Sequence, residues 1–143
     1  MFARRFTLAF AAALFFAVPV SAQNEFEMQV DFQMSIAEAF AESVGFTLDD
    51  MVFSSLDDSE DERMTFMLQS GRDYRMIALC DEDCDDIDIY LEDMDGNTID
   101  SDTSINDAPV VQATGRGERV RLRVNMYSCN VEPCYYAVGI FVR

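Results

Sequence analysis

The segment 80–102 constrains the fold of this chain more than any other part of the sequence. Cys80 and Cys84 are close enough in sequence to close one small loop. Apolar residues then alternate with carboxylates over residues 86–92, which is the period of a half-buried β-strand. Asp95-Gly96 follows, and both residues tolerate the positive φ that a tight hairpin turn requires. A strand, a hairpin and a cysteine-closed loop in one short segment indicate a β domain.

The same period-two pattern continues along most of the chain. The expected strands cover residues 51–56, 64–69, 74–80, 86–92, 97–102, 110–113, 119–126 and 135–142. Turn residues separate them, such as Ser70-Gly71-Arg72 and Gly115-Arg116-Gly117. About eight short strands at this spacing predict a mainly β fold, a jelly-roll-like antiparallel β-sandwich.

One amphipathic helix is expected before the strands. Ser35-Ile36-Ala37-Glu38 has the form of a capping box, so the helix is expected to begin at Ser35. Ile36, Phe40 and Val44 recur every four residues, and Gly45 supplies a left-handed stop. Residues 23–33 are expected to be a polar lead-in. We expect the apolar stripe of this helix to cover part of the core.

The N-terminus has the layout of a secretory signal peptide. Arg4 and Arg5 precede an apolar stretch, and Val20-Ser21-Ala22 forms a small-residue cleavage site. The apolar stretch is shorter than the roughly 20 residues of a membrane-spanning helix. The expected organisation is therefore a signal peptide over residues 1–22, a lead-in and helix over 23–50, and a β-sandwich over 51–143. An exported protein, periplasmic or extracellular and not membrane-embedded, is the prediction.

The charge of the chain excludes some partners. The formal net charge is −17, and it becomes −19 when Arg4 and Arg5 leave with the signal peptide. Such a field repels phosphate backbones and anionic membrane surfaces, so no nucleic-acid partner is expected. Solubility is an equally ordinary reason for an acidic surface.

Four cysteines in an exported chain predict two disulfides. The local pairs Cys80–Cys84 and Cys129–Cys134 are favoured among the three possible connectivities. A zinc site built from all four cysteines is the competing hypothesis, although zinc prefers tighter Cys-x-x-Cys spacing and a reducing compartment.

The chain contains no histidine and no lysine, which removes the commonest general base and Schiff-base chemistry. Carboxylates, tyrosines and arginines remain. A secreted hydrolase that uses paired carboxylates is the alternative function. However, carboxylates occur throughout the chain and no pair stands out, so the sequence predicts a protein that is not an enzyme and has no catalytic residues.

Two groups of charged residues are candidate binding sites. A weak calcium site is predicted at the first cysteine loop, because a disulfide would hold its carboxylates together. Its ligands would come from Asp81, Asp83, Asp85, Asp86 and Asp88. Asp93-x-Asp95-Gly96-Asn97 superficially resembles the start of a calcium-binding loop, but a hairpin turn explains it more simply.

The second group is an arginine ladder on one face of a single strand, formed by Arg119, Arg121 and Arg123. Cross-strand partners are expected among Asp86, Asp88 and Asp100. A face that binds anions or acidic polysaccharide is the functional alternative, since guanidinium groups suit carboxylates.

Several motifs together resemble the bacterial pre-peptidase C-terminal (PPC) domain. They include Cys80-Asp81-Glu82-Asp83-Cys84, Asp95-Gly96-Asn97, the alternating run over residues 120–126, and the Cys129 to Cys134 pair. The similarity covers about residues 53–142 and is greatest to short, stand-alone exported members with two cysteine pairs. It implies a jelly-roll-like sandwich that often accompanies a secreted peptidase and binds substrate or matrix, and some relatives bind calcium. The expected function is an exported, non-catalytic binding or accessory module whose partner is a protein or an extracellular polymer.

Overall fold

The computed structural model describes residues 23–143, so the predicted signal peptide lies outside the described residues. One helix and eight strands follow one another: α1 (Gln23–Ser43), β1 (Thr47–Leu56), β2 (Asp61–Leu68), β3 (Asp73–Cys80), β4 (Cys84–Asp93), β5 (Thr98–Asp102), β6 (Val110–Thr114), β7 (Glu118–Cys129) and β8 (Cys134–Val142). The expected mainly β fold with one N-terminal helix is confirmed.

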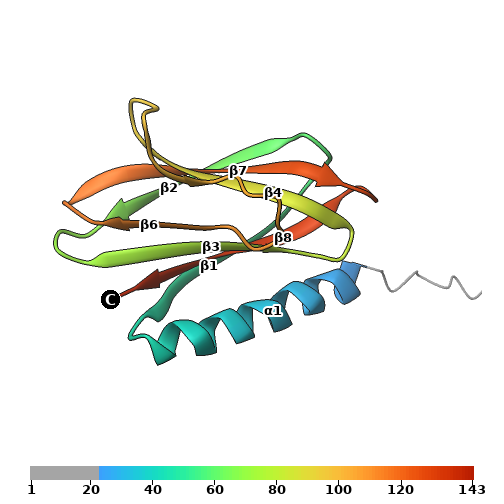
Figure 1. The fold of residues 1–143 in the computed structure, drawn as a ribbon, viewed down its shortest axis with the longest axis horizontal. Coiled ribbons are helices and arrows are strands. Elements are labelled where there is room, and N and C mark those ends of the chain that lie inside the picture. The colour runs from blue at the N-terminus through green and yellow to red at the C-terminus, as the bar shows by residue number, and fades with distance from the viewer. Residues whose placement is uncertain (1–22) are drawn as a thin grey trace, which may run out of the picture.

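The strands form two antiparallel sheets of four. Sheet A has the order β1-β8-β3-β6 and sheet B the order β2-β7-β4-β5. The antiparallel pairs β1–β8, β2–β7, β3–β6 and β4–β5 are nested, as if one long hairpin had been rolled up. This is the strand order of a jelly roll. Figure 1 shows three layers, with sheet B above sheet A and α1 lying along the outer face of sheet A.

Two separate apolar clusters hold these layers together. The larger cluster fills the space between the sheets, where alternate residues of β4 (Ile87, Ile89, Leu91) and of β7 are fully buried. The smaller cluster joins α1 to sheet A and contains Val30, Met34 and Phe141. Fully burying one such side chain contributes about 1.5–3 kcal/mol, so both clusters matter for stability.

The helix differs from the sequence prediction at its N-terminus and in the face that it buries. It begins at Gln23, so the predicted lead-in is helical, and Ser35 lies inside the helix. The Ser35 hydroxyl donates to the carbonyl of Phe32 (2.7 Å), as serines in helix interiors do, so the predicted capping box is wrong. The C-terminal stop is confirmed, because Gly45 has φ of 85° and the Phe46 amide donates to the Ala41 carbonyl (3.0 Å).

Aspartate side chains accept hydrogen bonds from exposed backbone amides at two places on the sandwich. Asp93 accepts hydrogen bonds from the amides of Asp95 (2.9 Å) and Asn97 (2.8 Å), which confirms the hairpin turn predicted there. Along the open side, Asp102 and Asp100 of β5 accept from the amides of Val110 (3.0 Å) and Gln112 (2.8 Å) of β6. The Val110 amide is the largest cause that lowers the pKa of Asp102. These contacts join the free edge of sheet A to sheet B and satisfy edge amides that would otherwise invite another strand.

Candidate functional site

The two predicted disulfides are present, Cys80–Cys84 and Cys129–Cys134. Each closes the loop between two consecutive strands, β3 with β4 and β7 with β8. The two loops are neighbours, because Cys84 of β4 and Cys129 of β7 stand opposite each other in the register of these adjacent strands. No free cysteine remains among residues 23–143, so the four-cysteine zinc site is ruled out for this structure.

The carboxylates in and beside the first cysteine loop each accept hydrogen bonds from different groups of the protein. Asp81 is buried and accepts from the amides of Tyr135 (2.7 Å) and Asp83 (3.2 Å). Asp85 accepts from the side-chain amide of Asn130 (2.8 Å), and Asp86 from the amide of Asn106 (3.3 Å).

In the described part of the chain, no three acidic, histidine or cysteine side chains lie together in a way that could hold a metal ion. The five predicted ligands therefore do not form one cluster. Calcium binding at this loop stays a prediction.

Asp81 and Asp88 carry an electrostatic cost that the sequence did not reveal. Burial is the main cause that raises the pKa of each carboxyl, and the negative charge of Asp86 raises the pKa of Asp88 further. Asp88 lies on the outer face of β4, where it accepts from the Tyr90 hydroxyl (3.3 Å). It borders a cleft of about 470 Å³ between the loop 103–109 and β7.

We expect Asp88→Asn to make the protein more stable at pH 7 and to lose the gain in stability that Asp88 contributes in mild acid. A carboxyl with a raised folded-state pKa binds its proton at a higher pH in the folded than in the unfolded chain. Asp88 therefore adds to the free energy of unfolding as pH falls from 7 through its raised pKa, and this gain is complete below the ordinary value of 3.8. Asp73, Asp93 and Asp102, whose pKa values are lowered, contribute in the opposite direction. The variant has no proton to bind there. Urea unfolding between pH 4 and 7 measures both effects.

The matched control is Asp85→Asn, which removes the same charge from an exposed position of the same strand. We expect its pH profile to keep the slope of the native protein. If the free energy of unfolding changed with pH in the same way in Asp88→Asn as in Asp85→Asn, burial would not raise the pKa of Asp88.

The arginine ladder lies where its alternation predicts, on the outer face of sheet B. Arg119, Arg121 and Arg123 stand opposite Met67, Thr65 and Arg63 of β2. Within residues 23–143, the ion pair of this ladder joins Arg123 Nε to Glu92 Oε1 (3.2 Å). The guanidinium of Arg123 also lies over the Tyr90 ring, 3.7 Å from its centroid.

The expected strand, β4, thus supplies the counter-charge, but the ion pair is made by Glu92 and not by Asp86, Asp88 or Asp100. Of the predicted partners, Asp88 is near enough for the charge of Arg123 to offset part of the rise in pKa that burial causes. Glu92 was not considered because the sequence did not fix which carboxylate of β4 lies closest to Arg123. An anion-binding role of Arg119 and Arg121 stays a prediction.

The most unusual surface is a row of large apolar side chains along α1 and the turn that follows it. We call this row the apolar stripe; it consists of Met28, Phe32, Ile36, Phe40 and Val44, each 41–67% exposed. The helix instead buries Val30, Met34 and Ala41 against sheet A. The predicted covering role of Ile36, Phe40 and Val44 is therefore wrong, since these residues face away from the core. Met28 and Phe32 were missed, although their four-residue spacing was visible in the sequence.

Packing against β8 places the helix and hence the stripe. Ala137 and Gly139 lie beneath α1, and a Cβ atom at Gly139 would be 2.6 Å from Met34 Sδ. These small residues let the helix lie close to the sheet. Near its first turns the ring of Phe26 stacks on Tyr135, with centroids 5.9 Å apart.

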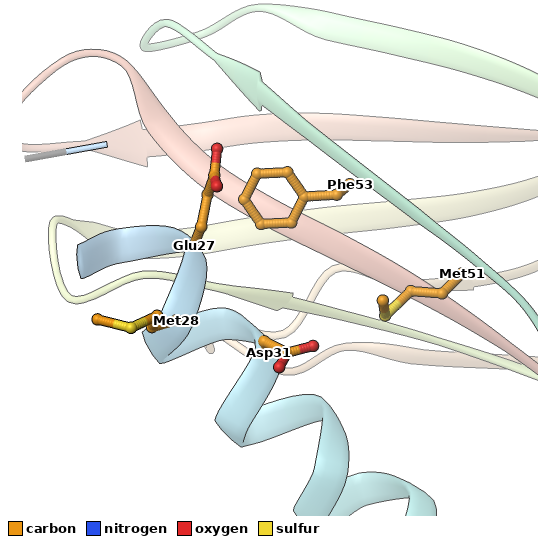
Figure 2. A pocket seen from close by; sticks show the side chains of 5 residues that line it. All are labelled: Glu27, Met28, Asp31, Met51 and Phe53. Atoms are coloured by element: carbon orange, nitrogen blue, oxygen red, sulfur yellow. The ribbon is translucent and has the colours of Figure 1, made fainter. Parts of the chain in front are cut away.

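Depressions lie on both sides of the helix because α1 is narrower than the sheet face beneath it. The β1 cleft, about 550 Å³, is lined by Glu27, Met28, Asp31, Met51 and Phe53. Figure 2 shows the Glu27 carboxylate beside the Phe53 ring, at the rim of this cleft. The cleft therefore combines an apolar wall on β1 with carboxylates on the helix.

On the other side lies the β3 groove, about 490 Å³, which is almost entirely apolar. Ile36 and Phe40 line it from the helix and Val110 lines it from β6, with Ile77 and Phe141 from the intervening strands. Stripe and groove thus share Ile36 and Phe40 and form one continuous apolar surface. Monomeric soluble proteins rarely expose such a surface without a binding role.

No helix within residues 23–143 has the length and apolarity that a membrane crossing needs. No protein-family model and no curated protein sequence matches this chain.

Proposed function

We propose that this chain is an exported, non-catalytic binding module of the bacterial envelope or extracellular space, and that it docks onto a partner protein through the apolar stripe and the β3 groove. The single observation that carries the proposal is the exposure of five large apolar side chains in one row on a helix that is already anchored by its opposite face. An isolated exposed leucine or phenylalanine is ordinary, but a continuous row is typical of a helix that contacts a second protein.

Other features support export and a binding role. The two disulfides suit an oxidising compartment, and the N-terminal sequence has the layout of a signal peptide. Several buried or turn carboxylates accept backbone amides, as Asp81 and Asp93 do, which gives them a structural use. Kinship with PPC domains and calcium stabilisation of the first cysteine loop belong to the proposal as predictions from the sequence motifs.

A photo-crosslinking amino acid placed at Phe40 and activated in the producing cells tests the docking surface. We expect one discrete crosslinked protein, because Phe40 is 65% exposed and belongs to both the stripe and the β3 groove. The same amino acid at Ile105, which is 88% exposed on a loop away from α1, is the matched control and should give no such product.

Identical products from positions 40 and 105, or none from position 40 in cells that export the protein, would contradict docking through the stripe. Turnover of a glycan, ester or peptide substrate by the purified protein, lost on replacing one carboxylate without loss of fold, would contradict the non-catalytic role and favour the hydrolase alternative.

A further inference from the structure

We infer that the partner surface which covers the apolar stripe is a basic amphipathic helix, with apolar side chains along one side and Lys or Arg beside them. This inference rests on the proposed function, because it names the chemistry of the segment that docks there. It follows from the shape of the stripe and groove together with the sign of the charges around them.

The shape suits a helix. The five stripe residues repeat every four positions from Met28 to Val44, and such a row is a ridge of the kind that packs between the side chains of another helix. The ridge is about 24 Å long at 1.5 Å per residue, so a partner helix of roughly 17 residues matches it. Beside the ridge, the β3 groove of about 490 Å³ offers Phe141 and Ile77 as an apolar floor for the partner's side chains.

The charges select the sign of the partner. All five charged side chains of α1 are carboxylates: Glu25, Glu27, Asp31, Glu38 and Glu42. The chain as a whole is strongly acidic, with 27 acidic residues against 10 arginines in the full sequence. A partner that lies along the stripe therefore enters a negative potential, which cationic side chains flanking its apolar row would relieve.

The nearby cations do not change this argument. Arg75 lines the β3 groove, but its guanidinium group rests on the Phe46 ring, 4.7 Å from the ring centroid, and that of Arg143 lies 4.6 Å from the same centroid. Arg143 also bonds Asp73 (2.9 Å). Both groups are engaged there, while the helix itself carries only negative charge.

The same charges argue against two other occupants. A second copy of the chain would place five carboxylates of one α1 against five of the other, and like charges across an interface cost binding energy. An anionic lipid surface is repelled for the same reason, and α1 has none of the Lys or Arg that helices lying on membranes carry.

Two labelled 18-residue peptides test the inference directly by fluorescence anisotropy. Both carry the same leucine stripe in a helical design; one is flanked by lysines and the other by glutamates. We expect the Leu/Lys peptide to bind at least tenfold more tightly than the Leu/Glu peptide. We also expect Phe32→Ser/Phe40→Ser to weaken its binding at least tenfold, although that variant keeps the full negative charge of the protein. Circular dichroism of the variant checks that its helix and sheets are intact.

Two further variants separate local charge from overall charge. Glu38→Gln/Glu42→Gln removes two carboxylates from α1 and should weaken the Leu/Lys peptide about threefold to tenfold. Asp95→Asn/Glu118→Gln removes the same charge from the β4–β5 turn and from the start of β7. Both positions belong to the sheet B side of the sandwich, which α1 does not cover, so the affinity should stay within twofold.

The outcomes distinguish this inference from the proposed function. Equal binding of both peptides, with loss of both in Phe32→Ser/Phe40→Ser, would overturn the basic partner and keep the stripe as a docking surface. Unchanged Leu/Lys binding by that variant would overturn both. A dimer in sedimentation that the variant abolishes would make a second copy the occupant, and stripe-dependent binding to phosphatidylcholine vesicles would make it a lipid surface; either result would overturn the inference.

Discussion

Replacing Gly115 by alanine is expected to lower the free energy of unfolding by about 3 kcal/mol, the upper part of the range for overpacking a closely packed site. A Cβ atom at this position would lie 2.2 Å from the backbone oxygen of Gln69 and 3.0 Å from its carbonyl carbon. Two turns meet back to back here: the Gly71 amide donates to the Gly115 carbonyl (2.9 Å), and the Gly115 amide donates to the Arg72 carbonyl (2.8 Å). The obstacle is backbone, so one of the two turns has to move. Urea unfolding measures the loss.

Gly117→Ala is the matched control because it alters the same turn without a close contact. The nearest atom to its added Cβ is Ser70 Cβ at 3.9 Å, but its φ of 82° lies in the left-handed region. That conformation costs an alanine about 1 kcal/mol. If Gly115→Ala were no more damaging than Gly117→Ala, the close approach of the two turns would not be a constraint on the fold.

Replacing Phe141 by alanine is expected to detach α1 from the sheet far more often than in the native protein. Phe141 is fully buried in the cluster that joins the helix to sheet A, and truncation of a buried phenylalanine costs about 3–5 kcal/mol. Because α1 contacts only one outer face of the sandwich, it can open while the interior between the sheets stays folded (Figure 1). We expect its amide protons to exchange roughly a hundredfold faster, since each 1.4 kcal/mol is a factor of about ten.

Leu122→Ala provides the contrast, because Leu122 is fully buried between the sheets and lies in the other cluster. It should destabilise the sandwich by a similar amount, about 3 kcal/mol, yet leave the local opening of α1 unchanged. Hydrogen exchange followed by mass spectrometry compares α1 with β4 and β7 in the two variants. Equal acceleration of the α1 amides in both would show that helix and sandwich open as one unit.

The burial of one further polar group was not visible in the sequence. The Tyr136 hydroxyl lies in the interior and donates to Glu62 Oε2 (2.6 Å), which also accepts from the Ser54 hydroxyl (2.8 Å). Burial is the main cause that raises the pKa of Tyr136. Residue 136 is far in the chain from residues 54 and 62, and the alternation of each strand does not show that these positions meet.

The sequence by itself determined the strands, their turns and the two disulfides. Alternation with period two shows which residues of a strand face inward, Gly96 and Gly45 provide positive φ, and the spacing of the cysteines favours two local pairs that each close a small loop. These signals are local, so they remain readable without knowledge of the partners of each strand. The eight predicted strands and the arginine ladder on one face of β7 were found for this reason.

Only the tertiary structure decided which side of α1 is buried, and with it the candidate site. The helix is apolar on two sides: Val30, Met34 and Ala41 lie on one, and Met28, Phe32, Ile36 and Phe40 on the other, where Val44 of the following turn continues the row. Helical period identifies both rows but does not rank them, and the larger side chains of the second row favoured the wrong one. The helix lies close to Ala137 and Gly139 of β8, so the row that fits against these small residues is the one that is buried. Met34, for example, packs over Gly139. That choice depends on the shape of a surface assembled from strands distant in sequence, and it leaves the bulkier row exposed, where we propose that a partner docks.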